Sequence, residues 1–256
     1  MTISTEISVF IYIDFLVSMG LQLSKIRYRP KRYVEHYYLC NYRPLHTGGD
    51  QLSQSLLRFK SAIQDDLRAW IDCSVSELKQ LAIPRDVIVM RALGSHETAV
   101  ESRTDTALDR LGKSIAKAFG IRWMPWLIAK ARHTRPLKSL TAKERRAEIK
   151  RTYQLTKDYF DFDGKRILLI DDITTTGITL TSIIRLIKQY FPDSRFKVFT
   201  LAKTEQESPL NASLHLSGSG YLWENDAGWR AAEPETEYNA YSKLVSCIRG
   251  DDFTID

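Results

Sequence analysis

From residue 85 onward, short apolar runs alternate with longer stretches in which apolar residues recur every three or four positions. The short runs are typical of buried strands, and the longer stretches of amphipathic helices. Strand candidates are DVIVMRAL (86–93), IRWMPWLIAK (121–130), KRILLIDD (165–172) and RFKVFTLAKT (195–204). Helix candidates are DTALDRLGKSIAKAFG (105–120) and TLTSIIRLIKQYF (179–191). This alternation predicts an α/β fold with a twisted, mainly parallel sheet flanked by helices.

The pattern before residue 85 is mixed. Apolar residues at helical spacing occur in 48–71, and SVSELKQLAIP (74–84) predicts a short capped helix that stops before its proline. The apolar stretch Ile7–Leu23 is interrupted by Asp14 and has no basic start or small-residue cleavage site. It therefore predicts a buried strand or helix, and neither a signal peptide nor a membrane span.

The pattern is also weak after residue 205. Trp223, Trp229, Tyr238 and Tyr241 indicate some packing there, whereas SGSG (217–220) indicates a turn. We therefore divide the chain into three parts. They are an N-terminal helical or mixed region (1–84), a core (85–205) and a C-terminal extension (206–256).

Charge is distributed unevenly, although the net charge is only +6. Basic residues dominate between residues 110 and 158, and acidic residues dominate from 205 to the end. This asymmetry favours one surface that faces a polyanion, with solvated helix faces as the alternative for individual residues. The three cysteines show no C-x-x-C spacing. They favour a reducing, cytoplasmic location over a disulfide framework or a zinc ribbon.

The segment RILLIDDITTTGIT (166–179) carries the candidate chemistry. In an open parallel sheet, ligands bind beyond the carboxyl ends of strands, and Asp171 and Asp172 stand at such an end. The threonines and Gly177 that follow form the turn into the next helix, where backbone N–H groups attract anions. In a ligand such as ribose 5-phosphate, the phosphate group can bind the turn while the two neighbouring hydroxyls donate to the carboxylates.

Three other interpretations share part of this pattern. In a Walker-type site, ILLIDD would pair with GKS at 112–114, but that triplet lies inside a predicted helix and lacks the preceding glycine. In a receiver domain, the paired acids belong to the first strand, whereas here two strand candidates precede them. A helix cap explains one threonine but not the whole string.

The same segment resembles the phosphoribosyl-pyrophosphate (PRPP) motif of type I phosphoribosyltransferases, which is an apolar strand, two acids, and a Thr/Ser-rich turn with glycine. ARHTRPLKSLTAKERRAEIKRTY (131–153) resembles the basic loop of the ComF-like branch of that superfamily. The chain departs from that branch in lacking its four-cysteine zinc module, and in reading RALGSHE after the first strand.

The resemblance implies a type I phosphoribosyltransferase core with a small hood built from the terminal segments. It also implies transfer of ribose 5-phosphate between PRPP and a nitrogen nucleophile, with Mg²⁺ held mainly by the substrate and no protein metal site. Asp171 and Asp172 would hold the ribose hydroxyls. The 5-phosphate would bind at Thr174, Thr175, Thr176, Gly177 and Thr179, and pyrophosphate at the loop of Arg91, Ala92, Leu93, Gly94 and Ser95.

In the basic loop, the resemblance implies a catalytic role for Arg132 and a flexible lid that includes His133, Arg135 and Lys138. An exposed loop histidine remains the alternative for His133, and a strand-end surface arginine the alternative for Arg91. The expected partner is PRPP or a nucleotide. Nucleic acid, a protein of a DNA-processing system and a second copy of the chain are further possible partners, and no membrane is expected. The alternative function is a non-catalytic PRPP- or nucleotide-sensing or nucleic-acid-associated module.

Overall fold

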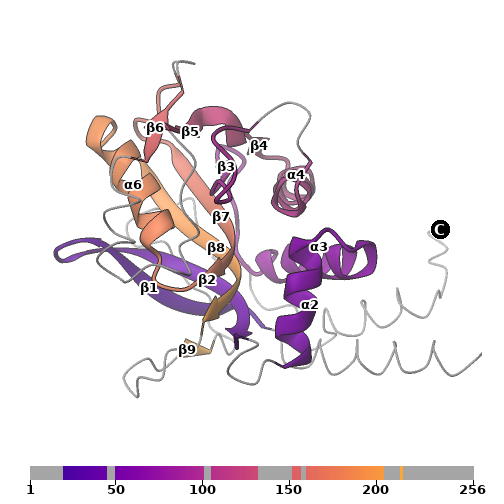
Figure 1. Ribbon diagram of the computed structural model, residues 1–256. Coiled ribbons are helices and arrows are strands. Elements are labelled where there is room, and N and C mark those ends of the chain that lie inside the picture. Colours follow the sequence, from indigo (N-terminus) through magenta and orange to yellow (C-terminus); the bar gives the residue numbers. More distant parts are fainter. Residues whose placement is uncertain are drawn as a thin grey trace, which may run out of the picture.

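A twisted central sheet organises the computed structural model, which describes residues 20–44, 50–100, 105–131, 152–156, 160–204 and the backbone of 214–215 (Figure 1). The described strands of this sheet run in the order β4-β3-β7-β8-β2-β1-β9. Their bounds are β1 (Gln22–Arg29), β2 (Arg32–Tyr42), β3 (Ile88–Arg91), β4 (Arg122–Trp123), β7 (Arg166–Thr174), β8 (Arg195–Thr204) and β9 (Leu214–His215).

The strands from β4 to β2 in this order pair in parallel, and β1 adds antiparallel pairs with β2 and with β9. The expectation of an α/β fold with a mainly parallel sheet is therefore confirmed. A separate antiparallel pair joins β5 (Ile128–Lys130) to β6 (Tyr153–Leu155), and the one-turn helix η2 (Pro125–Leu127) leads into it. Pro125 begins η2, so the strand candidate 121–130 is divided into β4 and β5.

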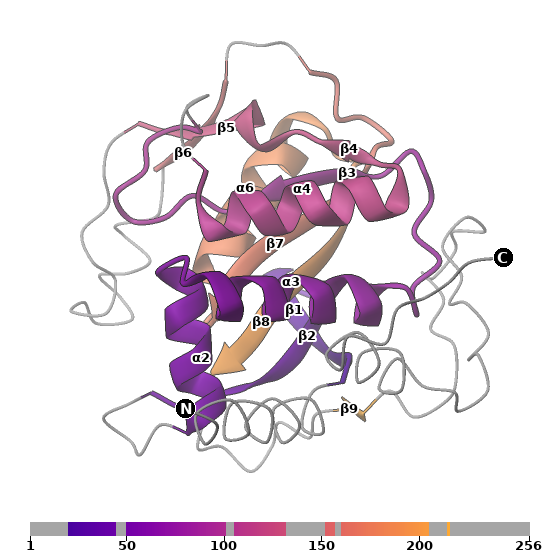
Figure 2. The same ribbon diagram turned by 90° about the vertical axis from the view of Figure 1, so that its right-hand side faces the viewer.

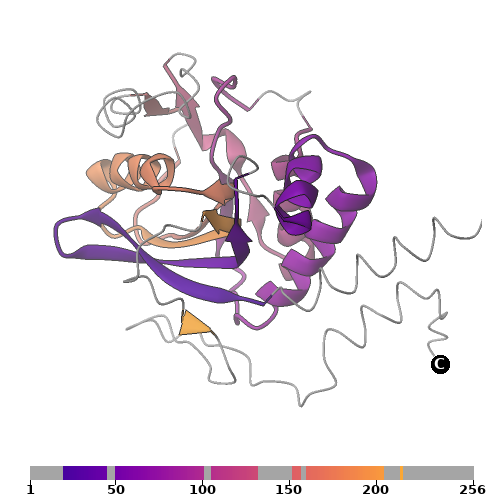
Figure 3. The ribbon, with the colours of Figure 1, turned by 60° about the horizontal axis from the view of Figure 1, so that its bottom comes forward.

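Helices cover both faces of the sheet. On one face lie α2 (Gln51–Lys60), α3 (Gln64–Leu78) and α4 (Ala107–Phe119), and Figure 2 shows α3 and α4 side by side in front of the strands. On the other face lies α6 (Ile178–Tyr190), next to the β1–β2 hairpin (Figure 3). Each face has its own apolar cluster, centred on residues such as Trp70 and Phe199 on the first face and Ile183 and Val198 on the second. Among the described residues, no helix is both long and apolar enough to span a membrane.

The sheet extends beyond the 85–205 segment, because the hairpin of β1 and β2 lies before residue 85. Strand β2 pairs in parallel with β8 along most of its length, from Glu35↔Lys197 to Tyr42↔Thr204. The sequence pattern did not identify these two strands. Of the apolar stretch Ile7–Leu23, only residues 20–23 are described, and of 206–256 only 214–215, which form the short strand β9.

The helical spacing across 48–71 does not correspond to one continuous helix. Residues 61–63 separate α2 from α3, and Ala62 adopts a positive φ of 57°. Helix α3 then continues to Leu78, so the predicted separate helix at 74–84 is only the last part of α3 and the turn after it. The turn lets α2 and α3 pack at an angle, with Asp66 accepting hydrogen bonds from Ser55 and Arg58.

The register of β3, β7 and β8 aligns the ends of the strands on which the candidate chemistry depends. Arg91 stands opposite Ile170, and the N–H of Ala92 donates to the carbonyl of Ile170 at 2.9 Å. The loop after β3 therefore begins beside the point where Asp171 and Asp172 follow Ile170. This edge is the carboxyl side of the parallel strands, where ligands bind in such sheets.

The GKS triplet at 112–114 lies inside α4, as the sequence predicted. A Cβ placed on Gly112 would lie 2.1 Å from a ring carbon of Trp123, so glycine here lets β4 pack closely against the helix. Because the triplet is helical, it cannot form the phosphate-cradling loop of a Walker site. The glycine therefore serves packing.

We expect Gly112→Ala to lower the free energy of unfolding by about 1–3 kcal/mol, which is typical of overpacking. The overlap with the Trp123 ring must outweigh the gain of about 1 kcal/mol that alanine brings to a helix. Urea denaturation measures the effect. In a Trp123→Ala background the clash is absent, so the same substitution should become stabilising. A destabilising effect in both backgrounds would contradict this account.

Candidate functional site

The two carboxylates of the candidate site follow a completely buried stretch of the central strand β7. Residues Ile167 to Ile170 are completely buried, whereas Asp171 and Asp172 are partly exposed. Because side chains alternate along a strand, the two carboxylates leave β7 toward opposite faces. The pair therefore lies at the boundary between the core and solvent, with one acid on each side of the sheet.

Lys60, the last residue of α2, forms an ion pair with Asp172, with 2.5 Å between Nζ and Oδ2. Burial alone would lower the pKa of Lys60, but the charge and the hydrogen bond of Asp172 outweigh it, and the pKa is raised. Lys60 thus stays protonated and brings a positive charge to the acid pair. Sequence reasoning missed this residue, because a lysine in the last turn of a helix is an ordinary feature.

Asp171 is the acid whose protonation is shifted. Burial, together with the negative charge of Asp172, raises its pKa to about 7, although Lys60 and Lys130 act in the opposite direction. Two neighbouring carboxylates share a site most easily when one of them holds a proton. At neutral pH the pair can therefore both accept and donate hydrogen bonds, which suits binding to hydroxyl groups.

The turn after β7 offers an anion site at the start of α6. Gly177 precedes the helix with a φ of 67°, a conformation that L side chains rarely adopt, and no described side chain caps the helix. Helix capping by a threonine, which the sequence left open, is thus absent from the described residues. Uncapped N–H groups at a helix start attract phosphate.

The threonines of this turn divide into two kinds. Thr175 and Thr176 are exposed, and Thr179 is partly exposed. Thr174 is 5% exposed, and its hydroxyl has no hydrogen-bond partner among the described residues. A buried hydroxyl without a partner costs free energy, so it is a polar group that a ligand can satisfy. The turn thus combines a helix start with both solvent-facing and unsatisfied hydroxyls.

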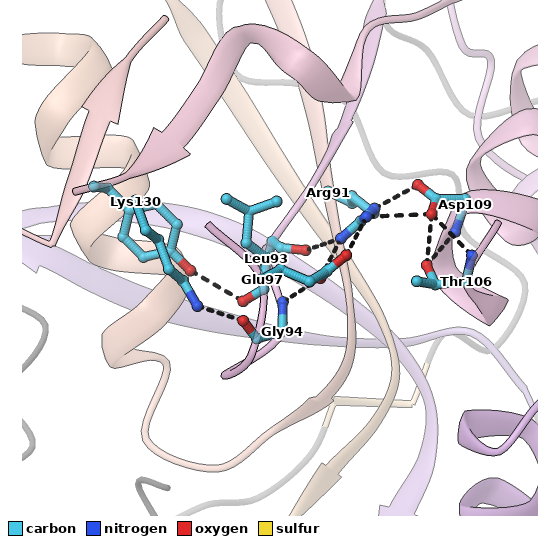
Figure 4. A network of polar contacts seen from close by, with 9 residues as sticks. Arg91, Leu93, Gly94, Glu97, Thr106, Asp109 and Lys130 are labelled. Carbon is cyan, nitrogen blue, oxygen red and sulfur yellow. Dashed lines mark hydrogen bonds and ion pairs between the residues drawn. The ribbon is translucent and has the colours of Figure 1, made fainter. Parts of the chain in front are cut away.

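Arg91, at the end of β3, is only 1% exposed. Nε and Nη2 donate to Asp109, at 2.6 and 3.2 Å, and Nη1 and Nη2 donate to Glu97, at 2.8 and 2.7 Å (Figure 4). The fifth N–H donates to the carbonyl of Ala92 at 3.0 Å. Since a guanidinium has five N–H donors, none remains for the phosphate contact considered from the sequence. The surface alternative is also wrong, because the side chain is buried.

Glu97 and Asp109, the two acids around Arg91, connect it to different elements. Asp109 is the third residue of α4 and forms a capping box with Thr106, which fixes the start of the helix. Glu97 lies in the loop after β3 and also accepts the N–H of Gly94 at 2.6 Å. The network therefore ties the end of β3, its loop and α4 together, and Glu97 was not identified from the sequence.

A second pair of residues holds the same loop from the side of the β5–β6 pair. Lys130 donates to the carbonyl of Gly94, and the hydroxyl of Tyr153 donates to the carbonyl of Leu93 at 3.3 Å (Figure 4). Burial lowers the pKa of Lys130 to about 8, although Glu97 and Asp171 counteract it. A lysine with a pKa near neutral, beside the acid pair, is a feature of functional sites. The sequence showed Lys130 only as part of a strand candidate.

The remaining predicted residues cannot be placed. Arg132, His133, Arg135 and Lys138 lie outside the described residues, which end at Ala131 on this side of the loop. Within the described part of the chain, no group of three or more His, Cys, Asp or Glu side chains is arranged to hold a metal ion. The described site thus consists of the acid pair, the β7–α6 turn and the loop after β3.

Comparisons with known proteins show similarity to phosphoribosyltransferases. The family model described as "Phosphoribosyl transferase domain" matches residues 112–213. Competence protein F of Haemophilus influenzae is 28% identical over 149 residues, which cover 55% of this chain and 63% of that protein. The matched region therefore spans less than two thirds of this relative. Residues 112–213 are thus similar to the phosphoribosyltransferase domain family, and the chain is similar in sequence to Competence protein F.

Solved structures of phosphoribosyltransferases are also similar to this chain. A hypoxanthine phosphoribosyltransferase from Staphylococcus aureus matches with 16% identity and a TM-score of 0.33, covering 58% of this chain and 70% of that one. An adenine phosphoribosyltransferase from Trypanosoma brucei matches with 14% identity and a TM-score of 0.38, covering 77% and 96%. The corresponding enzyme from Saccharomyces cerevisiae matches with 16% identity and a TM-score of 0.37, covering 77% and 89%.

We expect Asp171→Asn to raise the free energy of unfolding at pH 8 and to have little effect at pH 4. The pKa of Asp171 rises from 3.8 to about 7 on folding, so the folded state binds more protons between these values. Wild-type stability should therefore fall as pH rises through this window, by at most about 1.4 kcal/mol per pH unit. Asparagine removes this fall. Urea denaturation from pH 4 to pH 9 measures it.

The matched control is Asp163→Asn, which changes an exposed aspartate in the loop before β7. This variant should keep the wild-type dependence of stability on pH. If Asp171→Asn also kept it, the burial and charge around Asp171 would not act on its carboxyl as described.

Proposed function

We propose that the edge formed by β7 and α6 binds the ribose 5-phosphate part of PRPP–Mg or of a nucleotide. We further propose that the protein transfers this group to or from a nitrogen nucleophile, with pyrophosphate as the leaving group. The observation that carries the proposal is the uncapped start of α6, with the unpartnered hydroxyl of Thr174, directly after the acid pair. Phosphate and diol binding are thus available within one short turn.

Each part of the edge has a role in this proposal. The α6 start and the turn from Thr174 to Thr179 bind the 5-phosphate. Asp171 and Asp172 bind the 2′ and 3′ hydroxyls, and their negative charge favours the positive charge that develops at C1 in the transition state. Lys60 orients Asp172 through their ion pair. Partial burial of Asp171 strengthens these interactions, since water screens them less than at a fully exposed site.

Mg²⁺ fits this site as a partner of the substrate. The carboxylates of Asp171 and Asp172 are hard oxygen donors, and magnesium prefers a few carboxylates together with substrate phosphates over a complete protein cage. When bound, the ion would neutralise charge on the leaving pyrophosphate. The basic segment that includes Arg132, His133, Arg135 and Lys138 is proposed as the lid that excludes water from the reacting centre.

A non-catalytic function, in which the same edge senses PRPP or a nucleotide, is the second candidate. It is favoured by the loop after β3, where Gly94 N–H already donates to Glu97 and is therefore occupied. The similarity to Competence protein F extends this candidate to a DNA-related context, with nucleic acid or a protein as partner. Turnover of PRPP, measured as pyrophosphate release with candidate bases and amines, distinguishes the enzyme from the sensor.

We expect PRPP and ribose 5-phosphate, each with Mg²⁺, to bind and to stabilise the protein. At about 100 times the dissociation constant, a ligand adds about 2.7 kcal/mol to the free energy of unfolding. Asp171→Asn and Asp172→Asn should each weaken binding about tenfold or more, because each removes a carboxyl group that hydrogen-bonds to a ribose hydroxyl. Isothermal titration calorimetry and thermal shift measure both effects.

Asp163→Asn again serves as the control and should bind as the wild type does. Binding by both site variants at wild-type strength would contradict the ribose assignment. An unchanged melting temperature with PRPP, ribose 5-phosphate and nucleoside monophosphates would contradict the proposed function altogether.

A further inference from the structure

The loop after β3 contains an anion of its own. The carboxylate of Glu97 accepts three hydrogen bonds, from the N–H of Gly94 at 2.6 Å and from two nitrogens of Arg91 at 2.8 and 2.7 Å (Figure 4). A backbone N–H in a loop and a guanidinium fork are also the donors that bind phosphate oxygens. The carboxylate thus occupies a set of donors that suits a phosphate group.

Glu97 keeps its negative charge at neutral pH. Burial by itself would raise its pKa, but the hydrogen bonds from Arg91 and from Gly94 outweigh burial and lower the pKa below its ordinary value. A charged carboxylate in this position repels a diphosphate and competes with it for the N–H of Gly94. Other N–H groups of the loop are also committed, since Ala92 donates to Ile170 and Glu97 donates to Gly94.

The contacts around the loop allow Glu97 to leave without collapse of the rest. Arg91 keeps its two hydrogen bonds to Asp109. Lys130 and Tyr153 hold the carbonyls of Gly94 and Leu93 from the other side. The side chain of Glu97 is 19% exposed, compared with 1% for Arg91, so it borders solvent and can rotate outward. Its departure would free the N–H of Gly94 and two N–H groups of Arg91.

We propose that Glu97 is a specificity-determining residue that excludes diphosphate from the loop after β3 until its side chain swings out. We call the form in which Glu97 accepts from Gly94 and Arg91 the closed form. The closed form binds a ribose monophosphate at the β7–α6 turn. PRPP gains no affinity from its diphosphate in this form, because Glu97 occupies the donors of the loop. This inference rests on the proposed function, because it assigns the loop to the diphosphate end of the same ligand. In the closed form, the diphosphate of PRPP therefore adds no affinity beyond that of a ribose monophosphate.

The test compares the wild type with Glu97→Gln by isothermal titration calorimetry. Ribose 5-phosphate, PRPP and inorganic pyrophosphate are titrated separately in the presence of Mg²⁺. Glutamine keeps an oxygen that accepts from Gly94 or Arg91 but removes the charge. We expect wild-type affinities for PRPP and ribose 5-phosphate to agree within about threefold. The variant should bind PRPP and pyrophosphate about tenfold more tightly, a difference of about 1.4 kcal/mol, with unchanged affinity for ribose 5-phosphate.

Glu35→Gln is the matched control. Glu35 also pairs with a deeply buried cation, Lys197, at 2.7 Å, and its side-chain exposure of 23% is close to that of Glu97. The pair lies near the opposite end of the strands, so this control should change stability without changing the ratio of the two affinities. Glu97→Asp, which shortens the side chain but keeps the charge, provides a second test if Glu97→Gln does not fold, with an expected gain in pyrophosphate binding.

The outcomes separate this inference from the proposed function. If wild type binds PRPP at least about tenfold more tightly than ribose 5-phosphate and neither Glu97 variant changes this ratio, the role of Glu97 is wrong while ribose binding stands. If no form binds ribose 5-phosphate or PRPP, the proposed function fails. Titration with pyrophosphate then still tests the loop after β3 separately from ribose binding. If the Glu97 variants bind pyrophosphate no more tightly than the wild type does, the inference is wrong.

Discussion

A buried guanidinium is the interaction on which the arrangement of this site depends. Arg91 carries a full charge at a position that is 1% exposed, and a buried charge of this kind must be paired and hydrogen-bonded. Its partners come from α4 and from the loop after β3, so satisfying the guanidinium fixes both relative to the end of the strand. The capping box at Thr106 then sets the direction in which α4 leaves.

Charge compensation differs between the two ends of the sheet. Near the start of β8, Lys197 pairs with Glu35 and also donates to the hydroxyl of Tyr37, which in turn donates to Glu35. At the carboxyl ends of the strands, Lys60 pairs with Asp172, and the charges of Lys60 and Lys130 both act on Asp171, yet burial and the charge of Asp172 still raise the pKa of Asp171. Among the described residues, the charge of this acid pair is thus less fully compensated than that of Lys197, and such costs concentrate where a protein binds a ligand.

The local sequence pattern was sufficient to predict the strand, turn and helices that form the carboxyl edge of the sheet. The run from Ile167 to Ile170 indicates a buried strand, and Gly177 indicates a turn into the next helix; both are found, and the glycine adopts a positive φ. Helices α4 and α6 follow from apolar residues at helical spacing and from Gly120 and Pro192 after them. The PRPP-like string lies within this region, so the similarity to phosphoribosyltransferases also followed from residues that are adjacent in the chain.

The sequence by itself therefore determined the α/β fold, the acid pair at the end of β7 and the turn into α6, because each depends on periodicity or on neighbours within a few residues. Only the tertiary structure decided that β2 pairs with β8, that Lys60 reaches Asp172, and that Arg91 is buried between Glu97 and Asp109. Most of these contacts join elements that are distant in the chain, and even Glu97 meets Arg91 only through the fold of its loop. These contacts depend on how the helices pack on the sheet and on which buried charges must be paired. A local pattern of apolar and polar residues does not contain this information.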